Sequence, residues 1–242
     1  MNNVRIAFEI FEGEVKDIPI GYQKVDCHMI FDIKMGESFR RKAHMVAGGH
    51  TTEVPETLTY SSVVSRDSVR IALTIAALNG LKVLACDIQN AFLTSKCREK
   101  CYTRAGPEFG SDQGKLMMIT RALYGLWASG ASFRSFLGEA LYDLGYVPTK
   151  ADPDVWIRLA VKPCGFYYYE MLLCYVGDIL SISEEPLKNM KGIQRNSKLK
   201  DDKIAEPEYY QDARFAQKMK SDGSKYWSIS SEKYVKDAVA NV

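Results

Sequence analysis

The sequence lacks any long apolar run. Within its 242 residues, no uncharged stretch reaches the roughly 18 apolar residues that a membrane-spanning helix needs. No signal-peptide pattern precedes residue 20. We therefore expect neither a membrane protein nor a secreted one, and no membrane among its partners.

The cysteines lack a disulfide framework. Six of them are scattered without regular spacing, several inside apolar stretches, so reduced structural thiols are the expectation. Cys97 and Cys101 could form half of a zinc site, but no second Cys/His pair with ligand spacing follows them. A zinc site is therefore not the preferred interpretation.

The net charge is also small. A value of +2 does not by itself indicate a nucleic-acid binder. Residues 187–242 nevertheless hold 12 Lys/Arg against 8 Asp/Glu, and a second basic stretch lies at 34–42. These stretches either line a groove or form solvated faces. The hydrophobic content of 46% is that of a globular chain, long enough for one large domain or two lobes.

Two apolar stretches each contain one aspartate. Residues 81–93 read as a strand that carries Asp87, and residues 171–183 read as a hairpin with Gly177 and Asp178 at its tip. An ionised carboxylate inside an apolar strand is costly unless it is paired or binds a metal. We therefore interpret Asp87 and Asp178 as partners that share a cation.

Periodicity predicts the other elements of an α+β fold. Apolar residues at helical spacing predict helices at 65–79 and 133–144, and a shorter one at 184–193. Residues 1–20 are expected to be a poorly ordered lead-in, 95–114 a loop or irregular hairpin, and 196–208 irregular. Further strands are expected at 24–34, 39–46, 115–123, 155–161, 166–175, 213–219 and 225–229, with a helix from Ser231.

Four stretches together suggest a family. They are Arg-Arg-Lys-Ala-His-Met at 40–45, Asp-Ile-Gln-Asn-Ala-Phe-Leu at 87–93, Arg-Ala-Leu-Tyr-Gly-Leu at 121–126, and Cys-Tyr-Val-Gly-Asp-Ile-Leu at 174–180. In this order and spacing they resemble the reverse transcriptase domain of Ty1/copia-type retrotransposons. The alternative, an unrelated α+β domain, requires four ordered motifs to be coincidental.

The resemblance implies a right-hand polymerase fold within one reverse transcriptase domain. An antiparallel palm sheet would pack on helices, and the thumb would be incomplete. The fingers would comprise 1–82 and 97–128, the palm 83–96 and 129–212, and the end of the palm with the start of the thumb 213–242.

The resemblance also implies RNA-directed DNA synthesis with two Mg²⁺ ions, or Mn²⁺, about 3.5–4 Å apart. Partners would be an RNA or DNA template, a DNA primer, a dNTP and the rest of a Pol polyprotein, including a ribonuclease H that these residues lack. The location would be the cytoplasm, virus-like particles or the nucleus. Catalytic metal ligands would be Asp87 and Asp178 with Ile88, nucleotide contacts Lys42, His44, Phe92 and Tyr124, and primer contacts Tyr210 and Gln211.

Several of these positions depart from the family pattern. Gly177 stands where the family has the first hairpin aspartate, and His44 where it usually has arginine. Residues 127–131 replace a Lys-Gln-Ala-Pro-Arg run, and Gln211-Asp212 replaces Leu-Gly. His44 could equally be a solvent-facing strand residue and Phe92 a core aromatic. Two hypotheses follow, which are a weakened polymerase and a folded non-catalytic remnant that at most binds primer and template.

Overall fold

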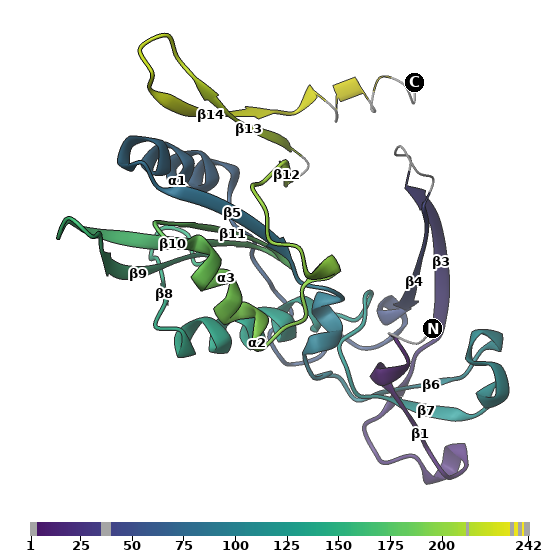
Figure 1. Ribbon diagram of the computed structural model, residues 1–242. Helices are drawn as coiled ribbons and strands as arrows, with labels where there is room; N and C mark the ends of the chain where they lie inside the picture. Colours follow the sequence, from purple (N-terminus) through teal and green to yellow (C-terminus); the bar gives the residue numbers. More distant parts are fainter. Residues whose placement is uncertain (1–3, 35–39, 212, 233–234, 237–238, 240–242) are drawn as a thin grey trace. The chain divides into compact units, whose positions relative to one another are not determined.

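The computed structural model describes residues 4–34, 40–211, 213–232, 235–236 and 239 (Figure 1). The chain divides into two compact units. The first unit comprises 1–61 and 90–137, and the second comprises 62–89 and 138–242. Both mix strands with helices, so the expected α+β class is confirmed.

The first unit contains two sheets. Four short strands form one sheet in the order β1-β7-β6-β2, and two long strands form the β3-β4 hairpin. The strands are β1 (Phe8–Ile10), β2 (Gln23–Lys24), β3 (Cys27–Lys34), β4 (Arg40–Ala47), β6 (Cys101–Arg104) and β7 (Leu116–Ile119). This unit also contains the short 3₁₀ segments Arg5–Ala7, Val15–Asp17, Gly49–Thr51, Ala91–Thr94 and Pro107–Asp112, the last of which is kinked at Gly110.

One prediction for this unit is wrong, and another is confirmed in one of its two alternatives. The expected poorly ordered lead-in contains β1, which pairs antiparallel with β7, and Phe8 packs edge-on against Phe109 with ring centroids 5.1 Å apart. At 95–114, where a loop or an irregular hairpin was expected, the hairpin is confirmed, because β6 pairs antiparallel with β7. Both strands are too short to show a period, so only their long-range partners fix them.

The second unit is built on a five-stranded antiparallel sheet. Its order is β5-β11-β10-β9-β8, so β5 is an edge strand. The strands are β5 (Lys82–Asp87), β8 (Val147–Pro148), β9 (Val155–Val161), β10 (Tyr167–Tyr175) and β11 (Asp178–Ser183). The helices are α1 (Arg66–Asn79), α2 (Ser129–Asp143), which begins in the first unit, and α3 (Pro186–Gln194).

Helix α1 confirms the prediction from periodicity. The Ser65 side chain caps its N-terminus by accepting a hydrogen bond from the Ser68 amide, and Gly80 ends it with φ 64°. Its apolar stripe packs on one face of the sheet, against alternate residues such as Val83 and Leu180. Helix α3 contacts β5 and β11 on the other face, as Figure 1 shows. Asp87 comes four residues after Val83, and Asp178 comes two residues before Leu180. Because alternate residues of a strand share a face, both aspartates lie on the face that α1 covers.

A smaller three-stranded sheet follows α3 in the chain. It consists of β12 (Tyr209–Tyr210), β13 (Ala213–Met219) and β14 (Lys225–Ser230), and β14 contacts α1. The predicted hairpin at 213–229 is confirmed. The helix predicted from Ser231 lies largely outside the described residues. Within the part of the chain that is described, no helix has the length and apolarity to cross a membrane.

Gly125 has less room for a side chain than any other glycine in the described part of the first unit. Gly125 has φ 92°, and a Cβ there would meet the Ala47 carbonyl oxygen at less than van der Waals distance. The Ala47 amide donates to the Tyr124 carbonyl at 2.8 Å, so the two segments cannot easily separate. Glycine is therefore required for two reasons, its positive φ and the lack of space.

Replacing Gly125 should test these two reasons separately. We expect Gly125→Ala to lower the free energy of unfolding by about 3 kcal/mol or more, since a left-handed alanine alone costs about 1–2 kcal/mol. Gly114→Ala is the matched control, because Gly114 has φ 84° with nothing within 4 Å of its virtual Cβ. Urea unfolding of both variants measures the difference. Equal losses would show that the contact with Ala47 is unimportant.

Candidate active site

The two strand aspartates lie directly opposite each other. In the β5·β11 register, Asp178 is the Cα partner of Asp87. Ala85 exchanges backbone hydrogen bonds with Ala205 on the side away from β11, at 2.7 and 3.2 Å. By alternation Asp87, two residues later, is then a non-hydrogen-bonded partner of Asp178, a pairing in which Cα atoms approach to about 4.5 Å. The two carboxylates therefore extend from adjacent strands on one face.

A strained turn precedes Asp178. Val176 has φ 52°, a left-handed conformation that is unusual for a β-branched residue. The carbonyl of Gly177 accepts a hydrogen bond from the Ile88 amide at 2.8 Å. This backbone contact ties the hairpin tip to the end of β5, and it does not depend on the side chain at position 177.

The two aspartates are more exposed than their strands suggested. Asp178 is exposed, and the Asp87 side chain keeps 38% of its surface accessible, although the flanking Cys86 and Ile88 are buried. The expectation of carboxylates inside apolar strands is therefore wrong in this respect. The reason is that both residues stand at strand ends, where the sheet face opens to solvent. Like charges opposite each other on neighbouring strands weaken the pairing of those strands, so a nearby positive charge would stabilise it.

A lysine supplies that positive charge. Lys200 Nζ lies 2.6 Å from Asp87 Oδ2. The pKa of Lys200 is raised, first by this hydrogen bond, with the charges of Asp87 and Asp178 also contributing. No pattern in the sequence indicated a role for Lys200, because this residue belongs to a charged segment without periodicity.

The segment that carries Lys200 is fixed along β5. The Gln89 amide donates to the Lys198 carbonyl at 2.9 Å, and Leu199 is fully buried as the bridge partner of Ile88. Lys200 begins the short 3₁₀ turn Lys200–Asp202. The buried leucine is the one local signal that could have placed this segment against the sheet.

The donor set suits a single hard cation. No cluster of three or more His, Cys, Asp or Glu residues with metal-binding geometry occurs in the described ranges. Two facing carboxylates are nonetheless the usual protein contribution to a Mg²⁺ site. Ile88 could add only its carbonyl oxygen, because its side chain is 2% exposed and packs in the core. Any cation bound to Asp87 Oδ2 must displace Lys200.

Three of the predicted nucleotide contacts form one aromatic cluster in the first unit. The Tyr124 ring lies 5.5 Å from His44 and 4.6 Å from Phe92 between centroids. The backbone pairing of Val46 with Tyr124 brings this cluster together. Tyr124 is 43% exposed and Phe92 is partly buried. Lys42 pairs with Asp32 in the β3-β4 ladder, but its side chain lies outside what the structure describes.

Comparison with known proteins decides the family. A family model described as "Reverse transcriptase (RNA-dependent DNA polymerase)" matches residues 10–237. The chain belongs to this reverse transcriptase family. Its relatives identify it as a Ty1/copia-type domain, since they include the Pol polyproteins of transposon RE1 of Arabidopsis thaliana and TNT 1-94 of Nicotiana tabacum.

The reverse transcriptase domain matches only a small part of each relative. Identity to the RE1 polyprotein is 28% over 67% of this chain and 11% of that protein, and to the TNT 1-94 polyprotein 26% over 70% and 13%. The Ty1-NL2 Gag-Pol polyprotein of Saccharomyces cerevisiae is 27% identical over 67% of this chain and 9% of that protein. The chain therefore spans about a tenth of the length of these relatives.

The residues expected to contact a primer have structural roles in this reverse transcriptase domain. Tyr210 is 3% exposed, and its hydroxyl donates to the Leu173 carbonyl at 3.0 Å. Gln211 has φ 50°, and its side-chain amide donates to the Val64 carbonyl at 2.6 Å. Primer binding by these two residues stays a prediction. Because the Tyr210 side chain is buried, that prediction concerns only its backbone. The neighbouring Asp212 lies outside the described residues.

The altered segment at 127–131 is well integrated. Trp127 donates its indole N–H to the Gly49 carbonyl at 2.7 Å, and Ser129 donates its hydroxyl to the Leu123 carbonyl at 2.6 Å. Helix α2 begins at Ser129 without the proline that the family pattern has there. The loss of basic residues here has therefore not disturbed the start of the helix.

Cys86 lies beside the aspartate pair but faces the opposite side of β5. Its thiol is 3.2 Å from the Met190 sulfur, and burial raises the pKa of Cys86 to about 12, with Asp87 and Asp178 adding to the shift. Because the folded pKa exceeds the unfolded value near 9, this group stabilises the fold below pH 9. That contribution is lost as the pH rises from 9 towards 12.

Alkylation should report this thiol's protonation. At pH 8 we expect iodoacetamide to modify the exposed Cys164 readily and Cys86 at least 100-fold more slowly, because its thiolate fraction is roughly 1000-fold reduced. Peptide mass spectrometry over time measures both rates in one sample. Urea-unfolded protein is the control, in which the two rates should converge. Similar rates in the folded protein would contradict the burial of Cys86.

Proposed function

We propose that this chain is the polymerase core of a Ty1/copia-type Pol polyprotein, which extends a DNA primer on an RNA or DNA template. The observation that supports this most strongly is the register that sets Asp87 opposite Asp178. The fingers would comprise 1–82 and 97–128, the palm 83–96 and 129–212, and the end of the palm with the start of the thumb 213–242. The rest of the polyprotein, including a ribonuclease H, would act with this domain in the cytoplasm, in virus-like particles or in the nucleus.

Nucleotidyl transfer assigns a role to each of these residues. Bound Mg²⁺ would activate the primer 3′-oxygen and stabilise the charge that develops on the phosphates. Asp87 and Asp178 would hold and orient the ion, with the Ile88 carbonyl as a further oxygen donor. In the fingers, Lys42 would bind the triphosphate, and Phe92 and Tyr124 would support the sugar. His44, where the family usually has arginine, would be a weaker phosphate ligand.

Two features support an impaired site. The glycine at position 177 leaves two carboxylates where the family has three, enough for one ion but not for a stable pair. Lys200 forms an ion pair with Asp87 and so opposes the binding of a metal cation to this carboxylate. The second candidate function, binding of primer and template without catalysis, is favoured by this same ion pair, because it neutralises the carboxylate that would otherwise repel a phosphate backbone.

Restoring the missing carboxylate should restore rate. We expect Gly177→Asp to extend primers 100-fold to 10,000-fold faster than the native chain, since several kcal/mol of metal and transition-state stabilisation return at about 1.4 kcal/mol per decade. Primer extension on an RNA template with Mg²⁺ at about 5 mM measures the gain.

Gly177→Asn is the matched control for size without charge, and it should stay as slow as the native chain. A native chain that extends primers as fast as Gly177→Asp would overturn the proposed impairment. If no variant extends but all retain salt-sensitive binding to a primer-template duplex, the non-catalytic function is the correct one.

Removing the ammonium group of Lys200 should strengthen the binding of a metal ion to Asp87. We expect Lys200→Gln to bind Mn²⁺ at least 10-fold more tightly than the native chain, because the ion no longer competes with Lys200 for Asp87. Since both partners are largely solvent-accessible, stability should change by less than about 1 kcal/mol. Electron paramagnetic resonance of free Mn²⁺ measures the affinity without any need for activity.

Lys203→Gln is the control for this measurement, because Lys203 is exposed three residues away. It should bind Mn²⁺ as the native chain does. Lys200→Gln in combination with Asp87→Asn should lose the gain in affinity. If Lys200→Gln alone leaves Mn²⁺ affinity unchanged, the lysine and the metal do not share Asp87.

A further inference from the structure

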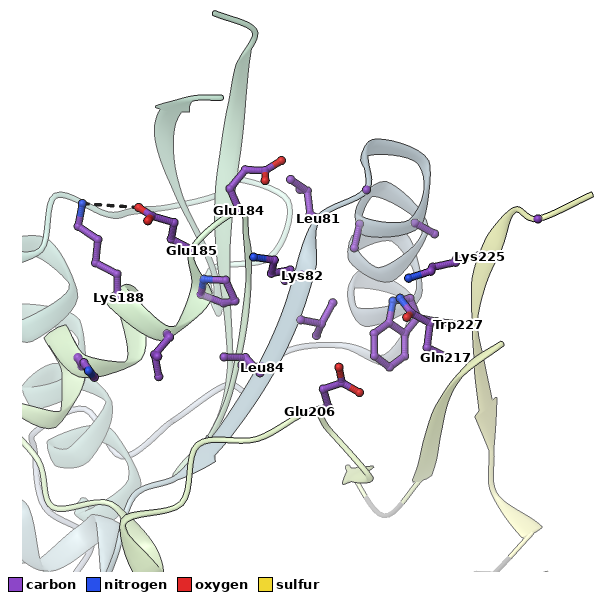
Figure 2. A pocket seen from close by; sticks show the side chains of 18 of the residues that line it. Leu81, Lys82, Leu84, Glu184, Glu185, Lys188, Glu206, Gln217, Lys225 and Trp227 are labelled. Carbon is purple, nitrogen blue, oxygen red and sulfur yellow. Dashed lines mark ion pairs between the residues drawn. The ribbon is translucent and has the colours of Figure 1, made fainter. Parts of the chain in front are cut away.

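A groove lies in the second unit at the start of β5, the end opposite Asp87. It has a volume of about 1070 Å³ and opens between the end of α1, the start of β5, α3 and the β13-β14 hairpin. Figure 2 shows Lys82 and Leu84 of β5, with the preceding Leu81, between Lys188 on one side and Trp227 on the other. Lys82 is five residues from Asp87, about 17 Å along the strand, so the groove is separate from the aspartate pair.

One wall of the groove is an unpaired strand edge. Ala85 pairs outward with Ala205, so Val83, two residues earlier, also directs its N–H and C=O away from β11. Neither group has a backbone partner among the residues that the structure describes. The segment that pairs with β5 through Ala205 ends there, because the next residues are Glu206 and Pro207. Proline has no N–H with which to continue the backbone hydrogen bonds to β5. Backbone groups without a partner at a strand edge are a template for an added strand, and those of Val83 lie in a residue that is 3% exposed.

The opposite wall offers a hydrogen-bond donor. The indole nitrogen of Trp227 is buried and has no acceptor within the described part of the chain. Most buried polar groups in folded proteins have a partner, so such a nitrogen calls for an explanation. A carbonyl or carboxylate of a segment in the groove would provide the missing acceptor.

The rim of the groove is basic. Four cations on it have no acidic partner among the described side chains, namely Lys82, Lys191, Arg195 and Lys225. Two of the three acidic residues are already paired, Glu184 with Lys162 and Glu185 with Lys188. Only Glu206 remains to offset the four, so the groove favours a ligand with negative charge.

We propose that this groove binds an extended acidic peptide segment of a protein partner, which adds to the edge of β5 as an extra strand. Backbone groups of the segment would pair with Val83 and accept from the Trp227 indole. Its carboxylates would meet the four rim cations. A nucleic-acid strand would satisfy the charges but not the donor and acceptor pattern of a strand edge, so a peptide is the better fit. This binding is independent of the polymerase chemistry.

The test uses the full chain and a defined probe. A fluorescein-labelled peptide of alternating glutamate and valine, about eight residues long, should raise fluorescence anisotropy on binding. The same peptide with a central proline should bind at least 10-fold more weakly, because proline cannot pair with a strand edge. A lysine-valine peptide should not bind.

Charge reversal locates the site. The double variant Lys191→Glu, Lys225→Glu should weaken binding of the acidic peptide at least 10-fold. Lys218→Glu is the matched control, because Lys218 lies on the same hairpin but does not line the groove. It should bind within twofold of the native chain. Circular dichroism confirms that the double variant is folded, and Gly177→Asp should bind the peptide normally.

Three results would overturn the proposal. One is no saturable binding at peptide concentrations of about 1 mM, which corresponds to only about 4 kcal/mol. Another is equal affinity for the proline peptide, which would exclude strand addition. The third is a single-stranded DNA of equal charge that displaces the peptide and binds more tightly, with the same sensitivity to Lys191 and Lys225, which would make the groove a nucleic-acid site.

Discussion

The ion pair between Lys200 and Asp87 joins the irregular segment after α3 to the end of the sheet in the second unit. Asp87 and Asp178 face each other across a close, non-hydrogen-bonded pair, and like charges in that geometry destabilise a sheet. Lys200 lies 2.6 Å from Asp87 and offsets part of this repulsion. The segment around Lys200 lies along β5 through backbone bridges at Ile88 and Ala85, so the ion pair and the packing of that segment support each other.

The sequence was sufficient for the framework of the fold. The periodicity of α1 and the hairpin of β10 and β11 follow from local patterns, since each involves residues close in the chain. That Asp87 and Asp178 are partners was inferred from two isolated carboxylates in apolar runs, supported by the family resemblance. Strands β1 and β6 did not follow, because each is only three or four residues long and depends on β7, far away in the chain.

The site was predictable only in part, for a related reason. Asp87 and Asp178 stand out because a carboxylate interrupts an apolar run. Lys200 does not stand out, because it is one of many charged residues in an irregular segment, and 113 residues separate it from Asp87. Tyr210 was expected near a primer but contributes its ring to the core. Sequence patterns reveal a charge in an unusual place, whereas a charge in an ordinary place acquires a partner only through the fold.

The changes at family positions are changes that this fold tolerates. Gly177 contributes a backbone carbonyl to Ile88, which any residue would supply, so the hairpin does not require an aspartate there. Trp127 and Ser129 hold the start of α2 by hydrogen bonds to the backbone, without the family's proline. The side chains that built the chemistry of the family are therefore largely separate from the contacts that maintain the sheet and its helices. The second set is what the structure shows, and it keeps the two aspartates in register across β5 and β11.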